Sequence, residues 1–457
     1  MIFFHELGHF LAARWRGLYV DRFQIWFGKP IWKKKINGVQ YGLGWLPAGG
    51  FVSLPQMAPM EEIEGEVEIP EDVKLKEITP KDKIIVAAAG PIFSFLLAVI
   101  FAVIVWFTGK PVDQFGSTVI GYVMPDSPAA QAGIVPGDQI LAVDGTPVTS
   151  WVGNMSGVKE LIMLGEEEKV TFTVKTPSGE VKDVECGFQI PETSWWQRKA
   201  LRQVGLIPAT PFAVDKVLPD SPAALAGLKS GDVVEKANGQ KVWSFITLEE
   251  LLKSEKPFSL EVRGENGETR TVEVHGTVPS NWQGKEGARP ILGALWKPIG
   301  SDVVNSIAYP TPMAQIKQSV KWMGDTLQKV AAPNSSVGIE HLSGPVGIAN
   351  HFYTILTVDG GWRIALWFAV ILNINLAILN MLPLPVVDGG HVVINTFEWV
   401  TKKTISLKVL GAVQMGFILL LGFVFIFVTS KDVGELFNGK SATEKLPEPI
   451  FQSSTKN

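Results

Sequence analysis

Cysteine is almost absent from this chain, and histidine is scarce. Cys186 is the one cysteine in 457 residues, so no disulfide can form within the chain and its stability cannot depend on one. A single cysteine leaves the cellular compartment undecided. Only six histidines are present. Any two of them at the spacing of metal ligands are therefore informative.

The chain also has little net charge. Its 41 basic and 45 acidic residues leave a formal charge of −4 at pH 7, which gives no indication of a nucleic-acid partner, and we expect none. Hydrophobic residues make up 46% of the sequence, and they gather in long runs on either side of a well-mixed charged middle region. This distribution predicts membrane segments joined to soluble modules. The N-terminus has no basic n-region, so we expect no cleavable signal peptide.

Three apolar runs are long enough to cross a bilayer as helices, which takes roughly 20 residues. They cover residues 84–107, 363–383 and 409–428, and the first contains Gly90-Pro91 as a kink or a point of close packing. Residues 1–16 predict a further apolar helix that is too short to cross by itself. We expect it to be either a partial insertion or part of a longer span.

The most specific motif lies in this first helix, as His5-Glu6-Leu7-Gly8-His9. Positions i and i+4 share one face of a helix, so His5 and His9 can bind one metal ion, typically zinc. Glu6 lies close enough to act as a general base on water at that metal. Because the flanking residues are apolar, we expect a metal site inside the membrane, where ionisable side chains are usually functional. The alternative is an accidental match on a helix of packed histidines.

A zinc site needs a third protein ligand, and residues 380–391 offer one. Asp388 is followed by Gly389 and Gly390, which allow close approach of the backbone, so it is a candidate carboxylate ligand. Its other possible role is to cap the helix that follows. His391 is a competing ligand, although a place at a helix start or beside a ligand suits it better.

The residues before Asp388 suggest an irregular, cavity-lining backbone. Pro383 and Pro385 end the regular helix, and irregular backbone is tolerated at membrane depth only where it lines a cavity or is buried in protein. Asn375 and Asn380 lie in the apolar run. They either form hydrogen bonds between helices or hold an extended substrate backbone near the metal.

Residues 23–52 alternate apolar and small side chains, which predicts a β-hairpin or sheet of short strands that dips towards the membrane. Its edge could pair with an unwound substrate by strand addition. A loop on the solvent side explains the pattern equally well. Residues 60–72 form an acidic linker. Basic residues dominate 14–35 and recur at Lys402, Lys403 and Lys408, so both loops are expected on the cytoplasmic side, with the middle region and the tail on the other.

The middle region contains an internal repeat. Residues 123–133 recur as 217–227 with a shared Ser-Pro-Ala-Ala core, and each copy continues into Gly-Asp and then a glycine turn. This order predicts a short helix, a strand and a hairpin turn. It resembles two PDZ domains in tandem, over residues 116–190 and 205–274. Such domains bind peptide or protein termini by strand addition, and the alternative is that they act as spacers or size filters.

Two further segments follow the repeat. Residues 311–332 have helical periodicity, which predicts an amphipathic helix that lies on the membrane or against the repeat. Residues 333–362 are then expected to form a loop and a short helix, and they contain Ser-Gly-Pro-Val-Gly-Ile-Ala at 343–349.

Taken in this order, the motif in the apolar helix, the tandem repeat, residues 343–349 and Asn-x-x-Pro-x-Pro-x-x-Asp-Gly-Gly-His resemble the site-2 protease family of intramembrane zinc metalloproteases, as far as about residue 432. The resemblance implies one Zn²⁺ per chain held by His5, His9 and Asp388, with Glu6 activating water. It also implies that a membrane-associated β-loop and the region around Pro383 help to seat the substrate. The residues expected to do so are Asn375, Asn380, Pro383, Pro385, Gly49, Gly50 and Phe51.

The resemblance further implies substrates and location. Family members cleave single-span membrane proteins such as anti-sigma factors, often after another protease has acted, and they also cleave remnant signal peptides. We therefore expect a multi-pass protein of the bacterial cell membrane, with extracytoplasmic PDZ domains and an active site near the cytoplasmic side.

The expected fold is thus a multi-domain membrane protein: an α-helical bundle of about four spans, a membrane-associated β-loop and two α+β PDZ domains. Residues 17–83 are assigned to the β-loop and linker, 384–408 to a ligand-bearing loop and cytoplasmic segment, and 429–457 to a tail. The alternative function is a non-catalytic membrane adaptor with a structural metal site, against which the intact motif argues. A soluble secreted zinc protease is excluded by the three spans.

Overall fold

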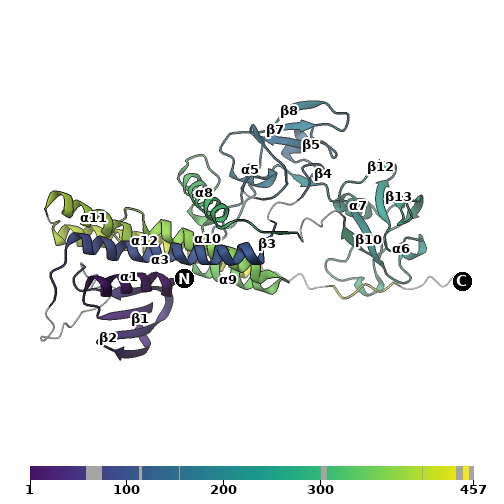
Figure 1. Ribbon diagram of the computed structural model, residues 1–457. Coiled ribbons are helices and arrows are strands. Elements are labelled where there is room, and N and C mark those ends of the chain that lie inside the picture. Colours follow the sequence, from purple (N-terminus) through teal and green to yellow (C-terminus); the bar gives the residue numbers. More distant parts are fainter. Residues whose placement is uncertain are drawn as a thin grey trace. The chain divides into compact units, whose positions relative to one another are not determined.

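The computed structural model describes residues 1–57, 75–112, 116–153, 155–299, 306–403, 405–438 and 446–451. The acidic linker expected at 60–72 lies outside the described residues. The chain divides into two compact units (Figure 1). The first comprises residues 1–110, 308–328 and 342–433, and the second comprises residues 111–307, 329–341 and 434–457.

Among its described residues, the first unit contains three helices that are long and apolar enough to cross a membrane. They are α3 (Pro80–Thr108), α10 (Gly361–Asn380) and α12 (Leu407–Asn438). The prediction of three full spans is thereby confirmed by length and composition. The bounds agree with those expected from hydropathy within three residues, with two exceptions: α3 begins at Pro80 rather than at residue 84, and α12 ends at Asn438 rather than at residue 428.

The early start of α3 has a local cause. Thr79 and Asp82 form a capping box, in which the Thr79 side chain accepts from the Asp82 N–H and the Asp82 carboxylate accepts from the Thr79 N–H at 3.0 Å. Arg16, in the last turn of α1 (Ile2–Arg16), also donates to Asp82 at 2.6 Å. This contact joins the end of the first helix to the start of the first span.

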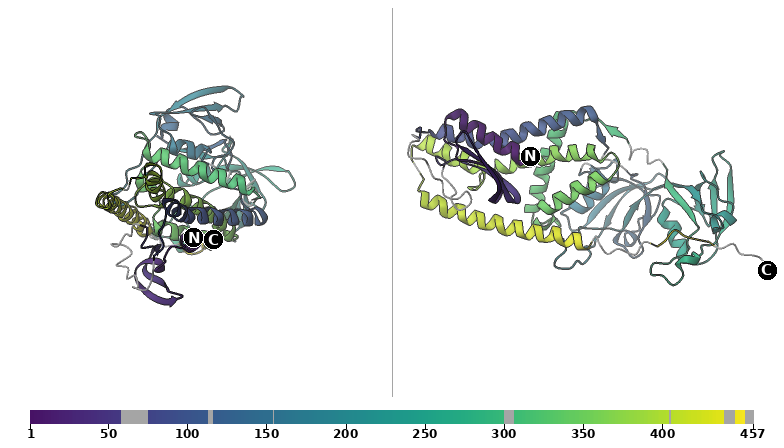
Figure 2. Two further views of the ribbon diagram at one scale, coloured as in Figure 1. Left: turned by 60° about the vertical axis from the view of Figure 1, so that its left-hand side comes forward. Right: turned by 90° about the horizontal axis from the view of Figure 1, so that it is seen from below.

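Helix α3 is the centre of the first unit and contacts α1, α10 and α11 (Asp388–Thr401). Its small residues Ala98 and Ala102 are fully buried against Val370 and Ile374 of α10. In contrast, α12 runs along the edge of this unit (Figure 2). Only 6% of its most apolar stretch of 18 residues is buried. The exposed side chains of α12 suit contact with lipid.

The hairpin consists of two long strands, β1 (Arg22–Ile36) and β2 (Val39–Ser53), rather than the short strands expected. Residues 22–25 pair with 50–53 on one side and with 40–43 on the other, and 32–36 pair with 39–43. The bent strands therefore form a sheet of four segments in the order 50–53, 22–25, 39–43 and 32–36, in which 22–25 runs parallel to 40–43 and the other two pairings are antiparallel. In the part of the chain that the structure describes, segment 50–53 lies at one edge of this sheet.

Helix α8 (Pro312–Ala331) lies where a helix was expected at 311–332, but its buried face is more polar than the apolar periodicity indicates. Its buried face includes Gln315 and Ser319, and the Gln315 amide donates to the carbonyl of Ala102 at 2.9 Å. Of the apolar residues that give this segment its periodicity, Met323 is also buried, whereas Met313 is 60% exposed. The small side chains of α3 allow this close approach, which hydrophobic periodicity does not reveal.

Residues 384–408, expected as a loop, contain helix α11, and residues 343–349 start helix α9 (Pro345–Thr357). The Gly347 N–H donates to the buried carboxylate of Asp432 at 2.8 Å, where a helix N-terminus favours negative charge. A Cβ on Gly347 would lie 2.6 Å from Oδ1 of Asp432. The glycines of this motif therefore admit the carboxylate of the last long helix.

The second unit contains the two repeats and their hydrophobic cores. The first core includes the fully buried Phe172, and also Cys186, where burial raises the pKa of the thiol to about 11.

The first repeat consists of β4 (Ile120–Val123), α4 (Pro128–Gln131), β5 (Gln139–Val143), β6 (Thr146–Pro147), α5 (Val158–Leu164), β7 (Val170–Lys175), β8 (Val181–Cys186) and β9 (Leu206–Pro208). The second consists of β10 (Phe212–Val217), α6 (Pro222–Leu225), β11 (Val233–Ala237), β12 (Gln240–Lys241), α7 (Phe245–Lys253), β13 (Phe258–Arg263), β14 (Thr269–Val274), η1 (Ser280–Trp282) and β15 (Ala294–Pro298). Outside the repeats, short strands β3 (Lys110–Pro111) and β16 (Ile307–Ala308) pair, and η3 spans Ile339–His341.

The strand pairing moves the boundaries of both repeats. Strand β9 falls within the module expected at 205–274, but it pairs with β4 of the first repeat. Strand β15 lies beyond residue 274 and pairs with β10 of the second. Each repeat is thus completed by a strand that returns long after the repeated motif, and a motif-based boundary cannot detect it. We use "first repeat" for residues 116–208 and "second repeat" for residues 212–298.

Candidate active site

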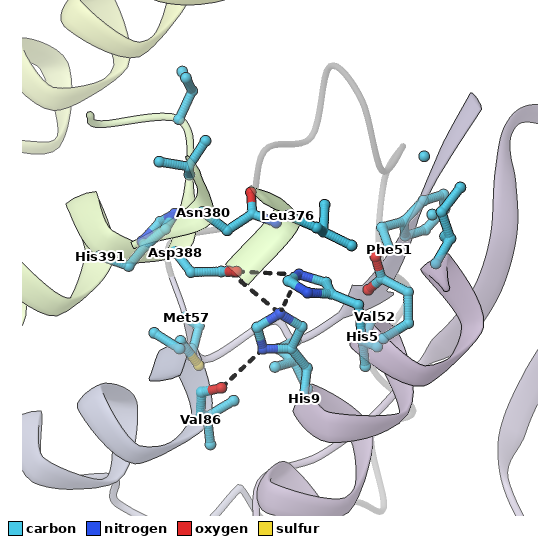
Figure 3. A pocket seen from close by; sticks show the side chains of 18 of the residues that line it. His5, His9, Phe51, Val52, Met57, Val86, Leu376, Asn380, Asp388 and His391 are labelled. Atoms are coloured by element: carbon cyan, nitrogen blue, oxygen red, sulfur yellow. Dashed lines mark hydrogen bonds and ion pairs between the residues drawn. The ribbon is translucent and has the colours of Figure 1, made fainter. Parts of the chain in front are cut away.

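Helix α1 presents His5 and His9 on one face, with their Nε2 atoms 3.3 Å apart (Figure 3). The motif forms a helix here because no proline interrupts it and Gly17, in the left-handed conformation that glycine favours, ends it. His5 and Glu6 are each only 8% exposed. The site is therefore buried as well as polar.

Asp388 reaches the same point from the first turn of α11. Its Oδ2 lies 3.1 Å from Nε2 of His5, and its Oδ1 lies 3.3 Å from Nε2 of His9. The following glycines allow this, since a Cβ on Gly389 would lie 2.3 Å from the Leu382 carbonyl oxygen. The preceding chain is thus folded tightly over the start of α11. We call His5, His9 and Asp388 the ligand triangle.

The ligand triangle has the dimensions of a zinc site. Bonds of about 2.0–2.1 Å to imidazole and carboxylate in a tetrahedral arrangement place neighbouring ligand atoms about 3.3 Å apart. The separations within the triangle are 3.1–3.3 Å. Two imidazoles and one carboxylate are also a typical donor set for catalytic zinc, which keeps a fourth position open. The residues present therefore fit Zn²⁺.

Two contacts from α3 orient the histidines. Nδ1 of His9 lies 2.8 Å from the Val86 carbonyl oxygen, so it carries the proton and leaves Nε2 free to bind metal. Nδ1 of His5 lies 3.0 Å from Oγ of Ser94, which is fully buried. Sequence reasoning missed Ser94 and the Val86 carbonyl. The only signal was their place in the same apolar run as Gly90-Pro91.

Glycines hold α1 and α3 close together. A Cβ on Gly8 would lie 2.5 Å from the Ala89 carbonyl oxygen, and a Cβ on Gly90 would lie 2.1 Å from Nε2 of His9. Separations below 3.0 Å require something to shift. The glycine inside the motif therefore has a packing role, and Gly90 leaves the space that the second histidine occupies.

Glu6 faces the β1–β2 hairpin next to the ligand triangle. A Cβ on Gly50 would lie 3.1 Å from Cγ of Glu6, so the hairpin backbone approaches this side chain closely. A cavity of about 390 Å³ joins these elements. Its lining residues are Ile2, His5, Glu6, His9, Phe27, Gly49, Gly50, Phe51, Val52, Leu54, Met57, Val86, Ala87, Leu376, Asn380, Val386, Val387, Asp388 and His391.

The cavity contains some of the residues expected to seat substrate. Gly49, Gly50, Phe51 and Asn380 line it, with the Phe51 ring stacked on Phe27 at 6.4 Å. The other three expected residues, Asn375, Pro383 and Pro385, do not belong to its described lining.

Pro385 and His391, which lie near Asp388 in the sequence, have different surroundings in the structure. The Pro385 carbonyl accepts from the Gln414 amide at 3.1 Å, which anchors the bend before Asp388. His391 lines the cavity but lies outside the ligand triangle.

Comparison with known proteins identifies the family. The sequence profile of Peptidase family M50 matches residues 1–423. The chain belongs to this family. It is 28% identical over 429 residues to the regulator of sigma-E protease RseP of Escherichia coli, covering 90% of each chain. It is 29% identical over 434 residues to the regulator of sigma E protease of Haemophilus influenzae, covering 89% of each chain.

The name of a third relative includes zinc. A Neisseria meningitidis protein that carries the name of a zinc metalloprotease is 30% identical over 431 residues, which cover 90% of this chain and 91% of the relative. The chain is therefore a multi-pass membrane enzyme of a zinc metalloprotease family.

Replacing Gly90 by Ala should reduce bound zinc at least tenfold, because the added Cβ displaces the ring of His9 from the ligand triangle. Zinc per purified chain, measured by elemental analysis, checks this. Gly411→Ala on α12 is the matched control, since its Cβ meets open space. Equal zinc content in the two variants would show that the α1–α3 contact does not position His9.

Proposed function

We propose that this protein is a zinc-dependent intramembrane endopeptidase. The observation that carries the proposal is the buried ligand triangle with Glu6 beside it, packed against a helix long and apolar enough to span a membrane. Ionisable groups in such surroundings are costly unless they are paired or bind metal. His5, His9 and Asp388 are the proposed ligands of one Zn²⁺ per chain, and Glu6 is the proposed general base.

The chemistry follows from the donor set and from Glu6. Zinc, when bound, acts as a Lewis acid on a peptide carbonyl and makes water a stronger nucleophile at neutral pH. The Glu6 carboxylate takes a proton from the water that attacks the carbonyl carbon. It then delivers that proton to the amide nitrogen as the C–N bond breaks. Val86 and Ser94 keep both histidine rings in place during these steps.

The hairpin supplies a means to hold an unwound substrate. Scissile carbonyls in a helix are hydrogen-bonded, so the substrate must be extended before cleavage. Segment 50–53 forms a sheet edge, and Gly50 and Phe51 line the cavity beside Glu6. We infer that the substrate adds a strand to this edge. Asn380 lies on the other side of the cavity and is proposed to bind the substrate backbone.

Substrates are proposed from the relatives. The Escherichia coli and Haemophilus influenzae proteins are named as regulators of sigma-E. This supports a single-span membrane protein of the anti-sigma-factor type as substrate, cut after a first protease has removed its outer part, and also remnant signal peptides. The membrane setting of the cavity suits such apolar segments.

The proposed topology has about four spans in a bacterial cell membrane, with α1 as part of the first. The two repeats are proposed to be PDZ domains on the extracytoplasmic side, where they bind peptide termini or limit substrate size. The basic residues of 14–35 and 402–408 support a cytoplasmic position for both loops and a nearby active site.

Glu6→Gln should lower the cleavage rate of a single-span model substrate by about 10²–10⁴-fold, because the amide cannot accept the proton of the attacking water. Zinc content should stay at the wild-type level, since Glu6 is not a ligand. A gel assay of cleavage by the full chain in detergent measures the rate, and elemental analysis measures the zinc content. Glu250→Gln, in an exposed ion pair of the second repeat, is the control. Cleavage at the wild-type rate by Glu6→Gln would contradict the proposed base.

Phe51→Ala should raise KM roughly tenfold while zinc content is unchanged, because the variant loses apolar surface at the cavity edge that the substrate strand covers. Initial rates over a range of substrate concentrations provide the measurement. Trp32→Ala is the matched control, as this aromatic residue is 55% exposed and lies on the opposite edge of the hairpin sheet. If both variants change KM equally, the edge at 50–53 is not the substrate-binding edge.

A further inference from the structure

The segment Leu446–Phe451 docks on the second repeat within the second unit. Its residues are Leu-Pro-Glu-Pro-Ile-Phe. The contacts are made by η1 and by Gly293, just before β15. This segment is not explained by the proposed proteolytic site.

The recognition is mainly of the peptide backbone. Carbonyl oxygens of the segment accept three hydrogen bonds: from Oγ of Ser280 to Ile450 at 2.9 Å, from Nδ2 of Asn281 to Glu448 at 2.7 Å, and from Nε1 of Trp282 to Pro447 at 2.8 Å. The Ser280 N–H also donates to the Ile450 carbonyl at 3.0 Å. Three consecutive residues of the second repeat thus bind three backbone carbonyls of one segment.

Asn281 binds both kinds of backbone group. Its Nδ2 donates to the Glu448 carbonyl, and its Oδ1 accepts from the Ile450 N–H at 3.0 Å. Pro447 and Pro449 have no N–H, and proline restricts the chain to extended backbone, so little conformational entropy is lost on docking. The chemistry of this surface therefore suits an extended, proline-containing segment.

The ring of Phe451 occupies a place that glycine keeps open. Gly293 has φ of +72°, and a Cβ there would lie 2.4 Å from Cβ of Ser221 in the same repeat and 2.6 Å from the Phe451 ring. The matching glycine of the first repeat, Gly205, has φ of +82°, and its nearest neighbours are Ser127 and Met124 of that same repeat. An aromatic side chain from outside the repeat thus covers this turn in the second repeat.

We propose that Ser280, Asn281, Trp282 and Gly293 form a peptide-binding surface, and that Leu446–Phe451 is its built-in ligand. An extended Pro-x-Pro segment ending in an aliphatic and an aromatic residue, when supplied by another chain, competes for this surface. Because the segment belongs to the same chain, its binding is intramolecular, so it excludes peptides that bind the surface more weakly. Exchange between the two ligands follows from their shared chemistry.

The test uses a fluorescent, C-terminally amidated Leu-Pro-Glu-Pro-Ile-Phe peptide and purified protein in detergent. Fluorescence anisotropy should show at least tenfold tighter binding to a chain shortened after Asn438 than to the full chain. In the full chain, Phe451→Ala should also tighten binding, which guards against misfolding of the shortened chain. Asn281→Ala in the shortened chain should weaken binding about tenfold, because two hydrogen bonds are lost. Gln283→Ala, at the exposed neighbour of Trp282, is the control and should not weaken binding.

Three outcomes would overturn the proposal. The first is equal peptide affinity for the full chain, the shortened chain and the Phe451→Ala variant. The second is unchanged affinity after Asn281→Ala. The third is no binding to either released form at peptide concentrations up to about 1 mM.

Discussion

The rest of the structure depends on holding four ionisable side chains together inside a bundle of apolar helices. His5, Glu6, His9 and Asp388 come from two helices far apart in sequence, and isolated charges in such surroundings are strongly disfavoured. Nε2 of both imidazoles and the carboxylate of Asp388 converge to within 3.1–3.3 Å, and a metal ion bound by all three would offset this cost. The arrangement requires α3 to lie very close to α1, which the glycines at the helix contact permit. Positions of Ser94 and Val86 follow from the same contact.

The same closeness sets how a substrate can reach the site. The hairpin backbone approaches Glu6 closely at Gly50. Gly50 and Phe51, which lie on the edge segment 50–53 of the hairpin sheet, line the cavity. In the proposed function, one element thus brings the extended substrate to the general base. Recognition of extended peptide recurs in the second repeat, where Asn281 and Trp282 bind a segment of the same chain. In both proposed sites the peptide backbone is the recognised group, so neither requires a particular sequence at every position.

Much of the helical framework could be predicted from the sequence, because long apolar runs and the spacing of two histidines are local signals. Asp388 could be named as a candidate ligand because it follows an apolar run with two prolines and precedes two glycines. Its possible role as a helix cap and the competing ligand His391 were left open by the sequence; in the structure Asp388 lies beside both histidines, and His391 lies outside the ligand triangle. Ser94 could not be selected, since its value depends on the register of α1 against α3. Strands β9 and β15 were assigned wrongly or missed, because their partners are distant in sequence. The buried polar face of α8 was hidden for a related reason: a glutamine is placed there by one carbonyl of α3.

X-ray absorption at the zinc edge, on the full chain in detergent, tests the central claim most directly. Multiple scattering counts the imidazoles bound to the metal, and the ligand triangle predicts two, with light-atom ligands at about 2.0–2.1 Å. The spectrum should be unchanged by His391→Ala, whereas Asp388→Ala should remove a ligand or the zinc itself. A spectrum with three imidazoles, or one that Asp388→Ala leaves unchanged, would contradict the account.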